Sequence, residues 1–226
     1  MKLNWNIFVF IAIGATSLYA QEGSHLPVTL GFKVGIPVTD MFSASNTSLF
    51  SGNTLVPGSS YNSAVPRYEF GVSGEFHLPK HLRLEVDGLY KRAGFASSAP
   101  FDSLGNLGYE STSLNVWEIP ALIKTNIRMG HFRPFVDVGA ALRHISTITE
   151  TDTLPGFSSQ LISDNSSALH NRNSFGGVAG FGITFKKGPF ELSPEVRYTR
   201  WANESFTAPG LRTNLDQGDV LLGIAF

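Results

Sequence analysis

Eight segments of the chain alternate between apolar residues and other residues with a period of two. This period is typical of β-strands whose two faces meet different surroundings. The predicted strands cover residues 28–36, 67–78, 81–95, 112–127, 132–147, 173–186, 189–201 and 216–226. In the last strand, one face carries only large apolar side chains, namely Val220, Leu222, Ile224 and Phe226. The pattern therefore predicts an all-β protein.

Long polar segments and short turns alternate between these predicted strands. The polar segments are rich in Ser, Asn, Gly and Thr, as loops are, and cover residues 38–65, 96–111, 148–172 and 202–215. Only two to four residues join the strands at Pro79, at 128–131 and at Lys187. All four long loops then emerge at one end. We therefore expect an eight-stranded antiparallel up-and-down transmembrane β-barrel, with long extracellular loops and short periplasmic turns.

Charged residues fall on the second face of these strands. The cations on this face are Lys33, Arg67, Arg83, Lys91, Lys124, Arg133, Arg143, Lys186 and Arg197. The anions are Glu69, Glu75, Glu85, Asp87, Glu118, Asp137, Glu191, Glu195 and Asp219. The interior of an eight-stranded barrel is filled by side chains, and buried charges must be paired. We predict a lumen plugged by ion pairs and an outer face in lipid; in the alternative, a soluble sandwich, the apolar faces would pack together.

Aromatic residues lie near both ends of the predicted strands, where a membrane barrel carries its aromatic belts. The loop end has Tyr68, Tyr90, Trp117 and Trp201. The turn end has Phe76, Phe132, Phe185, Phe190 and Phe226. Pro120 interrupts the fourth strand, and because proline cannot donate to a ladder, it predicts a bulge.

The amino terminus has the features of an export signal. Lys2 precedes an apolar run over residues 7–15, and small residues offer a cleavage position after Ala20. The run is too short to cross a bilayer as a helix. We expect a signal peptide over residues 1–20 and a barrel domain over residues 21–226. After Ala20 no apolar run is long enough for a membrane helix, so a membrane protein of this sequence would have to be a barrel.

Composition removes several classes of function. The chain has 17 Lys and Arg against 18 Asp and Glu, which argues against a nucleic-acid partner. It has no cysteine, which excludes disulfides, thiolate catalysis, cysteine-based metal sites and a lipid-modified amino-terminal cysteine. The sequence has no phosphate loop, dinucleotide fingerprint or hydrolase motif. We therefore predict no cofactor.

Histidines give two weaker hypotheses about chemistry. His77, His81 and His131 fall near predicted turns and could bind a metal, but interfacial polar residues are the simpler interpretation. His144 and Ser146 lie near the loop end of the fifth strand, where some outer-membrane barrels modify lipid A. Spacing assigns no carboxylate to orient the histidine. We predict no catalytic or metal-binding residue, with a lipid A deacylase or acyltransferase as the alternative.

The chain resembles the OmpA/OmpX-type outer-membrane β-barrel domains and is similar to the PorT-like families among them. The resemblance rests on Trp117-Glu118-Ile119-Pro120, on Arg133-Pro134-Phe135-Val136, and on the last strand ending at Phe226. It implies a bacterial outer-membrane location. It also implies that the barrel-insertion machinery reads the last strand, with Phe226 as the insertion signal.

These observations predict a monomeric outer-membrane protein that contacts outer-membrane lipid and lipopolysaccharide. Its role is expected to be structural or to depend on loops that bind a ligand of unknown identity, because binding residues gather on loops held by a rigid scaffold. A narrow solute channel and an accessory barrel in protein secretion are the further alternatives.

Overall fold

The computed structural model describes residues 28–43, 45–46, 49–51, 54–56, 60–63, 67–79, 82–100, 107–126, 132–154, 157–163, 169–208 and 211–226. The predicted signal peptide lies outside the described residues, and so do His81 and His131. A closed antiparallel barrel forms from the strands β1 (Val28–Pro37), β7 (Glu69–His77), β8 (Leu82–Pro100), β9 (Leu107–Asn126), β10 (Phe132–Leu154), β12 (Asn173–Lys187), β13 (Phe190–Trp201) and β16 (Asp216–Ala225). Pairing of β1 with β16 closes it, with Val34 opposite Leu222. The predicted eight-stranded fold is confirmed.

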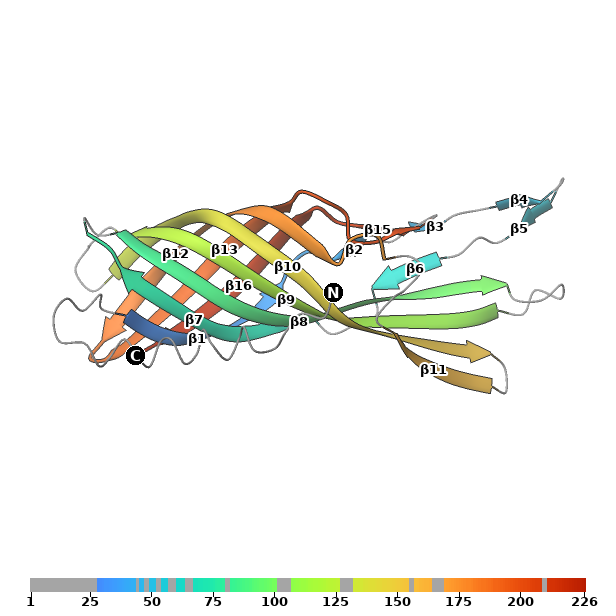
Figure 1. Ribbon diagram of the computed structural model, residues 1–226, viewed down its shortest axis with the longest axis horizontal. Coiled ribbons are helices and arrows are strands. Elements are labelled where there is room, and N and C mark those ends of the chain that lie inside the picture. Colours follow the sequence, from blue (N-terminus) through green and yellow to red (C-terminus); the bar gives the residue numbers. More distant parts are fainter. Residues whose placement is uncertain are drawn as a thin grey trace.

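Short and long connections lie at opposite ends of the barrel (Figure 1). The links β7–β8, β9–β10 and β12–β13 are short and lie at the same end as Phe226. Gly188 has a φ of 63° in the β12–β13 turn, a conformation that glycine adopts without steric cost. The other four links lie at the opposite end, called the mouth below. The predicted asymmetry of turns and loops is confirmed.

Two of the predicted loops are wrong over much of their length. The strand β8 continues to Pro100 and β9 begins at Leu107, so the two form a hairpin where we expected a loop over residues 96–111. The strand β10 continues to Leu154 and folds back as β11 (Phe157–Ser163). Both hairpins project beyond the barrel (Figure 1). These extensions are held together by backbone hydrogen bonds between their strands. Because they lie beyond the bilayer, their outer face needs no apolar residues, and the sequence shows no apolar alternation there.

The remaining connections contain short strands. The strand β6 (Ser60–Ser63) pairs with β8, and β3 (Ser45–Asn46) pairs with β6. The strands β14 (Thr207–Ala208), β15 (Leu211–Thr213) and β2 (Phe42–Ser43) form a small sheet at the mouth. The strands β4 (Leu49–Ser51) and β5 (Thr54–Val56) make a separate hairpin.

The predicted bulge at Pro120 is wrong. Pro120 is opposite Ala141 of β10, and the β8–β9 register is the same on both sides of it. Proline has no N–H to donate to the neighbouring strand. The effect at Pro120 is limited to two missing pairs, since Asp87 and Gly88 of β8 do not pair with β9. The register instead shifts between Ile145 and Ile148 of β10.

The two faces of the barrel have opposite character. Outer side chains such as Phe32 and Val138 are 55% and 62% exposed, whereas the inner Lys33 is 3% exposed. This polarity suits a barrel whose outer face meets lipid. Aromatic side chains pack against each other on the outer face near the mouth, where the rings of Tyr90 and Trp117 meet edge-on with centroids 5.2 Å apart. Trp201 is the exception to the predicted belts, because it points inward and is buried. Among the described residues, no helix is long and apolar enough to cross a membrane.

Candidate functional site

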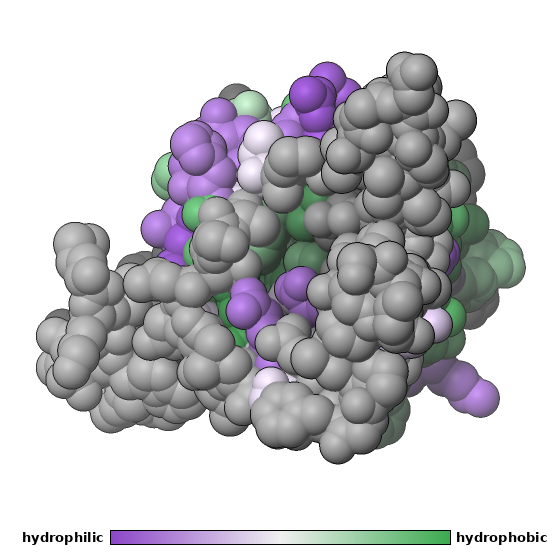
Figure 2. Space-filling view, turned by 90° about the vertical axis from the view of Figure 1, so that its right-hand side faces the viewer, coloured by the Kyte–Doolittle hydropathy of each residue, from purple (hydrophilic) through white to green (hydrophobic). Residues whose placement is uncertain are grey.

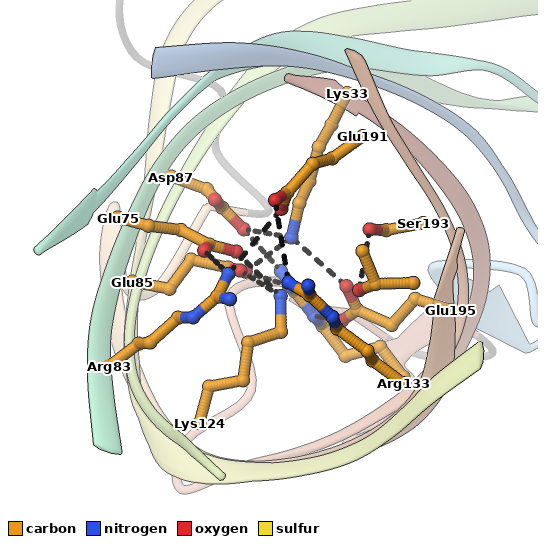
Figure 3. A network of polar contacts seen from close by, with 12 residues as sticks. Lys33, Glu75, Arg83, Glu85, Asp87, Lys124, Arg133, Glu191, Ser193 and Glu195 are labelled. Atoms are coloured by element: carbon orange, nitrogen blue, oxygen red, sulfur yellow. Dashed lines mark hydrogen bonds and ion pairs between the residues drawn. The ribbon is translucent and has the colours of Figure 1, made fainter. Parts of the chain in front are cut away.

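The centre of the lumen is occupied by charged side chains from opposite walls (Figure 3). Lys33 of β1 reaches three carboxylates. Its Nζ lies 3.1 Å from Asp87 Oδ2 and 3.0 Å from Glu195 Oε2, and it also contacts Glu85. These four side chains are 3% exposed or less. The contacts therefore join β1 with β8 and β13 across the barrel.

Two further cations complete this central cluster. Arg197 of β13 contacts the same three acids, with Nε 2.6 Å from Glu195 and Nη1 2.9 Å from Asp87. Lys124 of β9 contacts Glu85, and its Nζ lies 2.9 Å from Glu75. Lys33, Arg197 and Lys124 thus balance Glu85, Asp87 and Glu195. We call these six residues the central plug.

A second group of ion pairs lies toward the short turns. Arg83 Nη1 is 2.5 Å from Glu75 Oε2 and 3.6 Å from Glu191 Oε2. Glu191 also pairs with Lys186 at 2.8 Å and Arg133 at 3.9 Å. Lys186 is 44% exposed, so this group marks the transition from lumen to solvent.

A third group lies between the central plug and the mouth. Glu118 of β9 accepts contacts from Lys91 at 2.6 Å and from Arg143 at 3.0 Å. Gln217 of β16 donates to Glu118 at 3.0 Å and accepts hydrogen bonds from Arg143 and from Trp201 Nε1. The guanidinium of Arg143 stacks on the Trp201 ring, with Cζ 3.8 Å from its centroid. Trp201 and Gln217 therefore position the charged groups.

An apolar cluster covers this third group at the mouth. Its barrel members, on the inner face of β8, β9 and β10, are Phe95, Leu114, Val116, Ile145 and Ile148. Its other members, Phe42, Phe206 and Leu211, come from the loop segments. Phe42 packs edge-on against Phe95 and Phe206, with ring centroids 5.0 and 5.4 Å apart. We call this cluster the cap; Figure 2 shows apolar surface in the hollow at this end.

Within the described parts of the chain, two buried carboxylates of the lumen have no hydrogen-bond partner for either oxygen: Glu69 and Asp137. Each lies against a glycine of the neighbouring strand. A Cβ built on Gly35 would be 2.8 Å from Glu69 Oε1, and one on Gly180 would be 2.5 Å from Asp137 Oδ1. These glycines leave the space that the two carboxylates occupy.

The structure places most of the predicted lumen residues inside the barrel, but not all. Arg67 is a correction, because it precedes β7, is 47% exposed, and pairs with Asp40 at 2.5 Å outside the lumen. Asp219 lies inside and accepts a hydrogen bond from Gln217 at 2.7 Å. Sequence reasoning missed the inward Gln217 and the cap. The sequence contained one clue to the cap. On the inner face of β9, the charged residues Glu118 and Lys124 give way to the apolar residues Val116 and Leu114 toward the mouth.

The described contacts of His144 and Ser146 do not form a catalytic arrangement. His144 Nδ1 lies 2.7 Å from the amide oxygen of Asn173, and Ser146 donates to the Asn115 carbonyl. Neither contact joins the two side chains or brings in a carboxylate. In the parts of the chain that the structure describes, no group of three or more His, Asp or Glu is placed to hold a metal.

Comparison with known proteins identifies a family. The profile of the outer membrane protein β-barrel domain matches residues 19–201. No curated protein matches the chain. The chain is similar to the solved structure of Neisserial surface protein A (NspA), at 13% identity and a TM-score of 0.47, covering 90% of this chain and 98% of that one.

Two other solved structures have comparable similarity. The outer membrane protein OprG from Pseudomonas aeruginosa has 13% identity and a TM-score of 0.47, covering 88% of this chain and 94% of its own. Ail, the attachment invasion locus protein of Yersinia pestis, has 12% identity and a TM-score of 0.37, covering 87% and 96%.

Proposed function

The chain belongs to the outer membrane protein β-barrel domain family, and from this premise we propose that it is a non-conducting anchor whose projecting strands bind a partner outside the cell. A bacterial outer-membrane location follows from the family. The finer role is supported by one observation above all, the central plug, which joins opposite walls of the lumen.

The central plug supports a closed lumen because its charges satisfy one another. Three cations and three acids contact each other directly, and each is 3% exposed or less. Buried ion pairs with several mutual contacts are costly to break by removing one partner. A solute or ion would have to separate them to pass. The cap adds a second barrier to ions, because its apolar side chains offer an ion no hydrogen-bond partner.

The projecting hairpins support the binding role. They extend the barrel wall at the mouth with β8, β9, β10 and β11 (Figure 1). Their register places threonines of β10 on one face: Thr149 opposite Ser113, Thr151 opposite Ser111, and Thr153 opposite Tyr109. Tyr109 is 58% exposed. A surface of hydroxyls with an exposed aromatic ring, held on a rigid scaffold, is suited to recognition.

Two measurements test this proposal together. In a planar lipid bilayer, the purified protein should give no single-channel current. The variant Glu85→Ala/Arg197→Ala, which removes one acid and one base and so keeps the net charge, should conduct. A wild-type protein with steady current would make it a narrow channel instead.

The binding role is tested on a glycan and protein array. The full-length protein should bind at least one probe, and a variant with the two hairpins shortened to tight turns should lose that binding. The shortened variant must still migrate faster in SDS without boiling, which reports an intact barrel. Equal binding by both proteins, or no binding by the full-length protein, would contradict the role of the hairpins.

A further inference from the structure

Acids outnumber cations in the upper lumen, between the central plug and the cap. Three carboxylates lie there with two cations, and each of the five side chains is 5% exposed or less: Glu69, Glu118, Asp219, Lys91 and Arg143. We call these five residues the upper cluster. The central plug below it is balanced, and its cations Lys33 and Arg197 already contact three acids each. Among the described residues, one carboxylate of the upper cluster is therefore left without a compensating charge.

Glu69 belongs to this cluster because a glycine lets its side chain cross a strand. Glu69 of β7 is opposite Gly35 of β1. A Cβ on Gly35 would lie 2.8 Å from Glu69 Oε1 and 2.6 Å from Cδ2 of Leu221 on β16. The carboxylate thus lies over β1 and next to the strand that carries Asp219. The charged groups that act on it most strongly come from β16, β8, β9 and β13, and they are Asp219, Lys91, Glu118 and Arg197.

The partners that could satisfy Glu69 are committed to other acids. Lys91 is opposite Glu69 in the β7–β8 register, but its Nζ lies 2.6 Å from Glu118 Oε1. Gln217 donates to Glu118 at 3.0 Å and to Asp219 at 2.7 Å. In the part of the chain that the structure describes, Glu69 is the one acid of the upper cluster with no hydrogen bond to either oxygen.

An ionised carboxylate at this position would be buried without a partner. Burial of an isolated carboxylate is so unfavourable that such a group takes up a proton and becomes neutral. With one proton on Glu69, the upper cluster holds two negative and two positive charges. The protonated carboxyl can also donate a hydrogen bond, which the ionised form cannot. Asp219 Oδ1, which accepts no hydrogen bond from the described residues, is an acceptor in the same cluster.

We propose that Glu69 is a buried proton-binding site that makes the barrel sensitive to pH. Glu69 keeps its proton in the folded barrel at neutral pH, and release of that proton at higher pH leaves the upper cluster with an uncompensated negative charge. The bound proton therefore stabilises the upper lumen, and the stabilisation is lost as the pH rises. The inference is independent of the proposed function, which rests on the central plug and the hairpins.

The pH dependence of unfolding tests this proposal. An exposed glutamate of the unfolded chain loses its proton near about pH 4.3. From about pH 5.5 to 7, the folded barrel would then hold one proton more than the unfolded chain, so stability falls as the pH rises. Reversible urea unfolding in lipid vesicles gives the unfolding equilibrium constants of the wild type and of Glu69→Gln, which has the same size and cannot titrate. The ratio of the wild-type constant to the variant constant should rise about tenfold per pH unit, because unfolding releases one proton.

Asp216→Asn provides the matched control. Asp216 is 52% exposed and pairs with Arg200 at the surface, so it is ionised in both states over this pH range. Its ratio of wild-type to variant constants should not change with pH. If Glu69→Gln does not fold, Glu69→Leu takes its place, since it also removes the titrating group.

Infrared spectroscopy gives a second readout that needs no unfolding. At pH 7, the wild type should show the C=O stretching band of a protonated carboxyl with an intensity that Glu69→Gln lacks. A ratio that does not change with pH, or equal bands in the two proteins, would overturn the proposal, because Glu69 would then be ionised in the folded barrel. A ratio that follows the sodium concentration at constant ionic strength would overturn it as well, because a metal ion would compensate the charge in place of a proton.

Discussion

Replacing Lys33 with methionine removes the cation that three buried carboxylates share. Lys33 is 3% exposed, and Lys33→Met leaves Glu85, Asp87 and Glu195 with Arg197 and Lys124 only. Removing one partner of a buried ion pair costs about 3–5 kcal/mol, because the other charge stays buried without compensation. We expect the free energy of unfolding to fall by about this amount.

The assay is reversible urea unfolding of the barrel in lipid vesicles, followed by tryptophan fluorescence. The variant Lys33→Met/Asp87→Leu restores the charge balance, and it should lose less stability than Lys33→Met, since apolar replacements of whole buried pairs are often near neutral. Arg67→Met is the matched control, because the exposed Arg67–Asp40 pair contributes only about 0–1 kcal/mol. Equal effects of Lys33→Met and Arg67→Met would refute the reasoning that the central plug is a buried electrostatic unit.

Three further changes test other parts of the account. A Cβ on Gly139 would lie 2.0 Å from the Ala121 carbonyl oxygen, so Gly139→Ala should destabilise the barrel by about 1–3 kcal/mol in the same assay, whereas Gly177→Ala, with nothing within 4 Å, should be neutral. Phe206→Ala should loosen the cap and expose the segment around β14 and β15 to protease, while the heat-dependent gel shift of the barrel persists; loss of that shift would show that the cap holds the barrel itself. Phe226→Ala should lower the amount of barrel assembled in cells without changing folding into vesicles in vitro, and normal assembly in cells would contradict our prediction that Phe226 is an insertion signal.

The barrel could be predicted from sequence because lipid imposes a strict pattern on each strand. Where the outer face meets lipid, residues such as Val136 and Val138 must be apolar, and their neighbours Phe135 and Asp137 face inward. An alternation with a period of two then identifies both the strand and the side of it that faces lipid. The strand ends near the short turns were accordingly predicted to within two residues, as at Lys187 and Phe190.

The projecting hairpins could not be predicted by the same signal, because outside the bilayer that constraint is absent. Threonine still occurs at every second position, at Thr147, Thr149, Thr151 and Thr153. The residues between these threonines include Glu150 and Asp152, so neither face of this segment is consistently apolar. A search for apolar faces ends the strand too early at this point. Backbone pairing with β9 and β11 sets its true end at Leu154.

The candidate site was predictable as a set of charges but not as an arrangement. Alternation places Lys33 and Glu195 on the inner face, yet their 3.0 Å contact depends on the tilt and stagger of strands far apart in sequence. Glu69 and Lys91 are opposite each other in the β7–β8 register, but Lys91 turns to Glu118. Which acid receives which cation is decided by packing across the lumen.

The central claim is that the lumen is closed and polar while the outer face meets lipid, and cysteine labelling tests it most directly. The chain has no cysteine, so Val138→Cys and Ala141→Cys each introduce a single thiol on β10. Val138 is 62% exposed on the outer face, and Ala141 is 5% exposed inside. In vesicles, we expect Val138→Cys to react with a lipid-soluble maleimide and not with a charged one, and Ala141→Cys to react with neither. Rapid reaction of Ala141→Cys with the charged maleimide would mean that water fills the lumen, and would contradict the account.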